Sequence, residues 1–161
     1  MANKDIEKTN VMRILDGKKI PYRAHSYRPD ATMSGEEIAG ILGEDPAKVF
    51  KTLVTQGKSG TYYVFVVPVK EELDLKKAAN AVHEKAIEML KSKELLGLTG
   101  YIHGGCSPIG MKKFFTTTVD ETASILDRIY FSAGKIGCQV CIRPEDLEKM
   151  IPLAYADLTV S

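Results

Sequence analysis

Two neighbouring segments rich in β-branched and aromatic residues constrain the fold most strongly. Residues 49–54 and 61–69 carry these side chains, and a stretch with two glycines, 57–60, lies between them. Such runs favour β-strands, and glycines between two of them favour a tight turn. The sequence therefore predicts a β-hairpin near the middle of the chain.

Helical and extended segments are predicted on both sides of this hairpin. Ser34 and Glu37 have the spacing of a capping box, so a helix is expected to begin there and to end at Gly43. Gly97 is expected to end a short helix over 92–96. Further helices are predicted over 5–15, 73–82, 121–126 and 144–150, and a helical turn is predicted from Pro46. Extended segments or strands are predicted over 20–27, near Val119, over 128–131 and over 138–142. The pattern of residues 86–90 does not distinguish a helix from a strand. Without an internal repeat or a linker, this mixture predicts one α+β domain over residues 1–161.

Composition excludes several classes of function. The 22 Lys and Arg residues against 21 Asp and Glu give a net charge of +1, which excludes a strongly cationic, histone-like DNA binder. No apolar run is long enough for a membrane span, and three cysteines favour a reducing cytoplasm over a disulfide framework. The positive charge is concentrated in residues 48–93, which hold nine Lys against five acidic residues. A polyanionic partner is expected to approach there.

Several catalytic and metal-binding motifs are incomplete. The Gly57-Lys58-Ser59 stretch lacks the earlier glycine of a phosphate-binding loop, and Ile109 replaces the last glycine of a nucleophile elbow around Ser107. Cys138 and Cys141 lie in a predicted strand, where residues three apart face opposite sides. The three histidines have no ligand-like spacing. We therefore expect no hydrolase triad, no metal and no cofactor.

Two features favour a binding pocket. Lys51 lies in an otherwise apolar predicted strand, with Phe50, Thr52 and Val54 facing one way and Lys51 and Leu53 the other. Lys51 is either an edge-strand gatekeeper or a cation that holds a phosphate or an oxyanion. The second feature is a pair of glycine-bearing loops, over 100–110 and 132–137, whose backbone N–H groups can approach a ligand closely.

The ordered set of residues 50–53, 100–101, 104–110 and 132–137 resembles the YbaK/EbsC family. These are Cys-tRNA(Pro) deacylases, related to the editing domain of prolyl-tRNA synthetase. The resemblance implies a single mixed α/β domain with a barrel-like mixed β-sheet flanked by helices. It also implies a cytoplasmic trans-editing hydrolase without cofactors, which acts on the 3′ end of a mischarged tRNA and transiently contacts prolyl-tRNA synthetase.

The resemblance implies that Lys51 is catalytic. In this family the substrate cysteine's own thiol attacks its carbonyl, so the resemblance also implies that Cys106 takes no part in the reaction. The implied substrate-binding residues are Tyr27, Thr52, Gly104, Gly105, Ser107, Ser132, Gly134 and Gly137. Gln139 stands near an acidic position of some members, and Met33 with Ser34 replaces an aromatic one. These departures bear on substrate preference. The alternatives are deacylation of Ala- or Ser-tRNA, and a non-catalytic module that binds an aminoacyl group or a synthetase.

Overall fold

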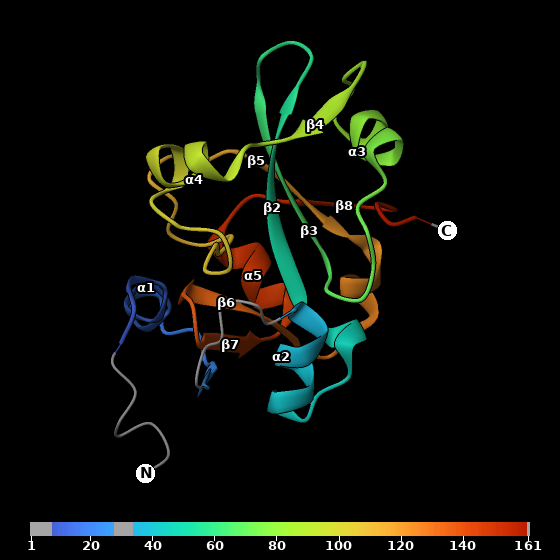
Figure 1. Ribbon diagram of the computed structural model, residues 1–161. Helices are drawn as coiled ribbons and strands as arrows, with labels where there is room; N and C mark the ends of the chain where they lie inside the picture. Colours follow the sequence, from blue (N-terminus) through green and yellow to red (C-terminus); the bar gives the residue numbers. More distant parts are fainter. Residues whose placement is uncertain (1–7, 28–33, 161) are drawn as a thin grey trace.

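The structure, a computed structural model, describes residues 8–27 and 34–160. Within these ranges the strands form two sheets with helices around them (Figure 1). The larger sheet has the order β4-β2-β3-β5-β8. Its strands are β2 (Phe50–Gly57), β3 (Tyr62–Pro68), β4 (Ile87–Met89), β5 (Thr116–Asp120) and β8 (Ala154–Ala156). Strands β2, β3 and β4 pair antiparallel, whereas β5 runs parallel to both β3 and β8.

The predicted hairpin is confirmed. Strands β2 and β3 pair from Phe50 opposite Pro68 to Gln56 opposite Tyr62. Phe50 and Val54 point into the larger hydrophobic core, while Leu53 packs against a second core on the other face, so the predicted alternation also holds for these three residues.

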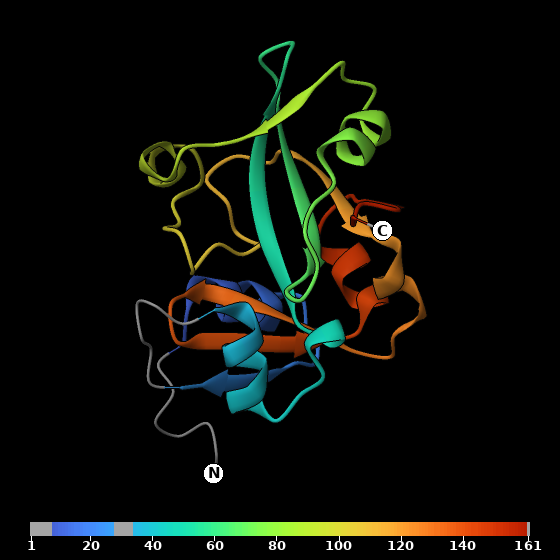
Figure 2. The same cartoon turned by 45° about the vertical axis from the view of Figure 1, so that its right-hand side comes forward.

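The smaller sheet is antiparallel with the order β1-β7-β6. Its strands are β1 (Arg23–Ser26), β6 (Ile129–Lys135) and β7 (Cys138–Ile142). Helix α1 (Asn10–Gly17) covers one face and α2 (Gly35–Leu42) the other (Figure 2). Phe131 and Val140 contribute to the core beneath α1, and Tyr130 and Cys141 to the core beneath α2. Cys138 and Cys141 therefore face opposite sides of the sheet, as the strand period requires.

The remaining helical segments lie around the larger sheet. They are the short 3₁₀ helices η1 (Pro46–Lys48) and η2 (Glu121–Ile125) and the α-helices α3 (Leu75–Ala81), α4 (Ser92–Thr99) and α5 (Pro144–Met150). In Figure 1, α3 and α4 lie on opposite sides of β2 and β3. Their buried residues agree, because Leu95 of α4 belongs to the larger core and Ala78 of α3 to the second one.

The expected single mixed α/β domain is observed, and its described strands form two sheets that do not close into a barrel. The capping box at Ser34 and Glu37 is present, with two hydrogen bonds of 3.2 Å each. The first helix begins at Asn10, and the earlier part of its predicted range, 5–7, lies outside the described residues. No helix in 8–27 or 34–160 is long and apolar enough to cross a membrane.

Three elements differ from the sequence-based prediction. Helix α4 passes through Gly97 and ends at Gly100, whose φ of 87° provides the left-handed cap. Gly97 is exposed and has no atom close to its missing side chain, so it does not interrupt the helix. Most of the predicted loop 132–137 is strand, because β6 extends to Lys135 through a bulge. Strand β8 was not predicted, because a segment of three residues is too short to show the alternation of apolar and polar side chains that indicates a strand.

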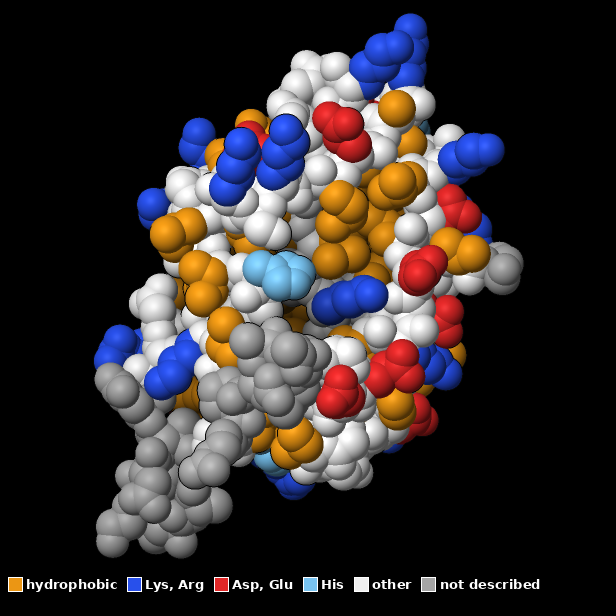
Figure 3. Space-filling view, in the orientation of Figure 1, with side chains coloured by type: hydrophobic (Ala, Val, Ile, Leu, Met, Phe, Trp, Pro, Cys, Tyr) orange, Lys and Arg blue, Asp and Glu red, His pale blue; other side chains and the backbone are white. Residues whose placement is uncertain are grey.

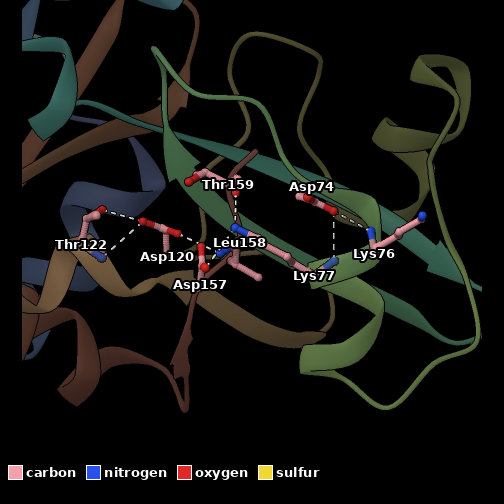
Figure 4. A network of polar contacts seen from close by, with 8 residues as sticks. All are labelled: Asp74, Lys76, Lys77, Asp120, Thr122, Asp157, Leu158 and Thr159. Carbon is pink, nitrogen blue, oxygen red and sulfur yellow. Dashed lines mark hydrogen bonds and ion pairs between the residues drawn. The ribbon is translucent and has the colours of Figure 1, made fainter. Parts of the chain in front are cut away.

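A buried carboxylate fastens the C-terminal segment to the larger sheet (Figure 4). Asp120 is 1% exposed, and its Oδ1 accepts a 3.0 Å hydrogen bond from the Leu158 backbone N–H. Its Oδ2 accepts from the Thr122 backbone N–H and hydroxyl at 3.2 and 2.6 Å. Nearby, the Lys77 ammonium donates to Asp157 and to the Thr159 carbonyl, which ties the same segment to α3.

Asp120→Ala is expected to lower the free energy of unfolding by about 3 kcal/mol, because it leaves a buried N–H of Leu158 without its acceptor. Urea denaturation measures the change. Asp157→Ala is the matched control, since its carboxylate is 56% exposed and its ion pair is worth less than about 1 kcal/mol. Equal losses in the two variants would contradict the structural role of Asp120.

Candidate active site

One cavity of about 260 Å³ lies where the larger sheet meets the smaller one. Strand β2 is paired along its length by β3, but β4 covers its other edge only at Thr55–Gly57. The uncovered edge at 50–53 therefore borders the cavity, and side chains from both faces of β2 reach it. Figure 3 shows a hollow on this side of the molecule, bordered by a histidine, a basic side chain and hydrophobic side chains.

Lys51 brings a cation to this cavity. It is half-buried and lies opposite Val67 in the β2–β3 register, so its backbone is held on one side by pairing with β3. Among the described lining residues there is no Asp or Glu, and no carboxylate in the described part of the chain pairs with the Lys51 ammonium. An ammonium without a paired carboxylate among these residues suits a phosphate or the developing negative charge of an oxyanion.

The glycine-rich loop 101–110 forms a second wall. The Tyr101 hydroxyl donates a hydrogen bond to the Ile109 carbonyl, which closes the loop on itself. Burial raises the pKa of Tyr101 to about 12, so this donor keeps its proton at neutral pH. His103, Gly104 and Cys106 of this loop line the cavity.

The end of β6 forms a third wall. A bulge lies between Ser132 and Lys135, and Gly134 in it has a φ of 95°. The Gly134 N–H donates to the Ser132 hydroxyl oxygen at 3.1 Å, and Ser132 lines the cavity. Gly134 does not line the cavity, and the position where a side chain would begin at Gly134 lies against the ring of Tyr101. The bulge thus connects this wall to the loop wall.

Cys106 is not an activated nucleophile. It is 7% exposed, and burial raises the pKa of its thiol to about 12. At neutral pH the thiol is protonated, whereas catalytic cysteines have a lowered pKa. Burial also raises the pKa of Cys138 and Cys141, and all three cysteines are free.

The structure brings together some of the expected site residues and not others. Lys51, Thr52, Gly104 and Ser132 line the cavity. Ser107 is fully buried behind the wall, where its hydroxyl accepts from the Ile109 N–H. The remaining four, which do not line the cavity, are Tyr27, Gly105, Gly134 and Gly137. Tyr27 and Gly137 are joined by a backbone hydrogen bond of 2.9 Å.

Other lining residues were not expected to bind substrate. Gln139 on β7 and Ser34 at the start of α2 line the cavity, although sequence identified them only as departures from the family pattern. Met33 lies outside the described residues. The capping box located the start of α2, but nothing in the sequence placed that end beside Lys51. Groups of His, Cys, Asp and Glu that could hold a metal are absent from 8–27 and 34–160.

Comparison with known proteins defines the class to which this fold and cavity belong. A family model described as an aminoacyl-tRNA editing domain matches residues 29–150. The chain is 43% identical over 161 residues to EbsC of Enterococcus faecalis, assigned as a Cys-tRNA(Pro)/Cys-tRNA(Cys) deacylase, which covers 99% of this chain and 98% of that protein. The chain therefore belongs to the aminoacyl-tRNA editing domain family, among its YbaK-like members.

More distant relatives agree with this assignment. The chain is 26% identical over 99 residues to a proline–tRNA ligase of Fervidobacterium nodosum. The aligned region covers 62% of this chain and 17% of that protein. A crystal structure assigned as a trans-editing enzyme for prolyl-tRNA synthetase has a TM-score of 0.81 at 24% identity, covering 96% of this chain and all of that one. The hypothetical protein APE2540 has a TM-score of 0.85 at 20% identity, over 94% of this chain and 100% of that one. At these identities the two structures establish the fold.

Proposed function

We propose that this protein is a cytoplasmic trans-editing deacylase that cleaves the aminoacyl ester of mischarged Cys-tRNA(Pro). The observation that carries the proposal is the cavity in which Lys51, Gly104 and Ser132, from three distant parts of the chain, lie on three walls. The near full-length similarity to EbsC supports cysteine as the aminoacyl group. The similarity to part of a proline–tRNA ligase supports prolyl-tRNA synthetase as a transient partner.

The chemistry needs little from the protein. An aminoacyl ester is already activated, so positioning and charge stabilisation are sufficient to accelerate its cleavage. The substrate's thiol sulfur forms a bond to its own carbonyl carbon, the ester C–O bond breaks, and the thiol proton passes to the departing ribose oxygen. The products are a cyclic thiolactone and free tRNA. Lys51 supplies the cation for the terminal adenosine phosphate or the oxyanion, and the glycine-rich loop surrounds the aminoacyl group.

Loss of ester from charged tRNA tests the proposal. Purified protein is incubated with Cys-, Ala- and Ser-charged tRNAs, alone and with prolyl-tRNA synthetase. Rapid loss of cysteine with slow loss of alanine and serine is expected, and a trapped thiolactone would identify the thiol-assisted route. A preference for alanine or serine would assign the other deacylase specificity, and inactivity on every substrate would leave only a binding role.

Cys106→Ala is expected to retain most of the deacylase activity, within about threefold of wild type. The protonated thiol of Cys106 belongs to the cavity wall and carries no reactive charge. Initial rates on Cys-tRNA(Pro) measure the effect, and slow alkylation of the native protein by iodoacetamide is an independent check. Complete loss of activity, in a variant that still unfolds cooperatively, would assign the attacking sulfur to the protein.

A further inference from the structure

Among the described residues, three buried side-chain atoms have no hydrogen-bond partner, namely His25 Nε2, Thr52 Oγ1 and Gln139 Oε1. Two of them, those of Thr52 and Gln139, belong to residues that line the cavity. Gln139 is 5% exposed, and its Oε1 accepts no hydrogen bond from any residue in 8–27 or 34–160. The Thr52 hydroxyl oxygen is likewise buried and unpartnered. Both residues line the cavity that holds Lys51. Buried polar groups without partners are rare in folded proteins, because they lose their hydrogen bonds to water without replacement.

The two sheets place these atoms at one site from opposite directions. Gln139 on β7 lies opposite Ser132 on β6 and opposite His25 on β1. Directly opposed residues of antiparallel strands share a face, so these three polar side chains form a row across the smaller sheet. Thr52 comes from β2 of the larger sheet. The unpartnered acceptors therefore belong to different sheets and border the same space.

The chemistry of the lining restricts the group that would satisfy them. A carboxylate ligand would find Lys51 but would bring no donor to Gln139 Oε1. A substrate amino group carries several N–H donors, and the described lining offers it no Asp or Glu. The acceptors that these lining residues offer to an amino group are therefore uncharged oxygens, such as Gln139 Oε1 and the Thr52 hydroxyl. They suit an amine close to the Lys51 cation, because a like charge favours the amine's uncharged form, which still donates hydrogen bonds.

We propose that Gln139 and Thr52 form the subsite for the α-amino group of the aminoacyl ester, and that they select for substrates that carry it. This inference rests on the proposed deacylase function. Gln139 holds the amine from the floor of the cavity and Thr52 from the β2 edge. The carbonyl is thereby directed toward Lys51 and the glycine-rich loop.

The test compares two substrates that differ only in the amine. One is tRNA(Pro) charged with cysteine, and the other is the same tRNA charged with 3-mercaptopropionate, which keeps the thiol and lacks the amino group. Wild type is expected to favour the cysteinyl ester by roughly tenfold in kcat/KM, the effect of a well-formed hydrogen bond between neutral groups. Gln139→Met is expected to lower this ratio toward that of the uncatalysed reactions of the two esters, by slowing the cysteinyl ester alone.

Three further variants make the result specific. Thr52→Val, which keeps the β-branched shape, is expected to reduce the preference in the same direction. Gln139→Glu keeps an acceptor at this position and is expected to keep the preference. Gln56→Met makes the same chemical change on β2 outside the cavity, where the Gln56 amide donates to the Gly60 carbonyl, and should alter neither rate.

An unchanged ratio in Gln139→Met would overturn the amine subsite, and so would an equal loss on both esters, which indicates a merely structural role. Both results leave the proposed function intact, because wild type would still cleave the cysteinyl ester. Wild type that cleaves neither ester would instead overturn the proposed function, and this inference with it.

Discussion

Lys51→Met should lower kcat/KM for Cys-tRNA(Pro) by about 100-fold or more, the usual cost of removing a group that stabilises transition-state charge. Lys51 is the cation that β2 places in a cavity whose described lining holds no carboxylate, so its charge is not neutralised there. Methionine preserves the length and the apolar stem of the side chain, and strand pairing with Val67 is unaffected. The expected loss is therefore one of charge. Initial rates of ester loss measure it.

Lys48→Met is the matched control for this substitution. Lys48 ends the short helix η1 just before β2 and does not line the cavity, so its rate should stay within about twofold of wild type. Lys51→Arg separates charge from shape, because a guanidinium keeps the charge but spreads it over a planar fork. Partial activity is expected. If Lys51→Met were as active as Lys48→Met, Lys51 would be the gatekeeper of an exposed strand edge.

Gly134→Val should cost about 3 kcal/mol of stability and also impair the cavity. The φ of 95° at Gly134 is strained for any side chain and most for a β-branched one. A Cβ there would lie 2.9 Å from Tyr101 Cε1 and 3.1 Å from Val11 Cγ2, both on buried residues. The Tyr101 ring must move, and its hydrogen bond to Ile109 holds the loop that carries Gly104.

Thermal unfolding and deacylation rates together measure this effect. The stability loss should be accompanied by a fall of roughly tenfold in kcat/KM at a temperature where the variant remains folded, because a small displacement of a positioning loop is costly. Gly97→Val is the control, since Gly97 is exposed on α4 and a Cβ there meets no atom within 4 Å. A folded Gly134→Val protein with unchanged kcat/KM would contradict the prediction that the bulge positions the glycine-rich loop.

Local signals in the sequence were sufficient for most of the fold. The hairpin, the capping box at Ser34 and the final helix from Pro144 follow from residues adjacent in the chain. The predicted secondary structure was wrong or incomplete where pairing with a strand distant in the sequence determines the conformation. Residues 132–135 carry a glycine and a serine and favour a loop, yet pairing with β7 holds them as a bulged strand. Strand β8 depends on its parallel partner β5, which local pattern does not reveal.

The site was predictable where a residue conflicts with its local surroundings. Lys51 in an apolar strand is such a conflict, and it lines the cavity. The glycines were harder to interpret, because Gly104 borders the cavity while Gly134 shapes a wall from behind. Gln139 carries no conflict in the sequence, since a glutamine in a strand is ordinary. Its proposed role follows from burial without a hydrogen-bond partner among the described residues, which is a property of the assembled sheets.

The pairing of β1 with β7 has a consequence for the synthesis of the chain. Arg23 meets Cys141, so β1 lacks its partner strand until β7 has left the ribosome. At the usual rates of translation, about 5–20 residues per second, this interval is on the order of 10 s. Throughout it the edge of β1 is free to pair with other nascent chains. Because residues of both β2 and β7 line the cavity, a nascent chain that stops short of β7 lacks part of its wall, and we expect the proposed activity only after β7 has been made.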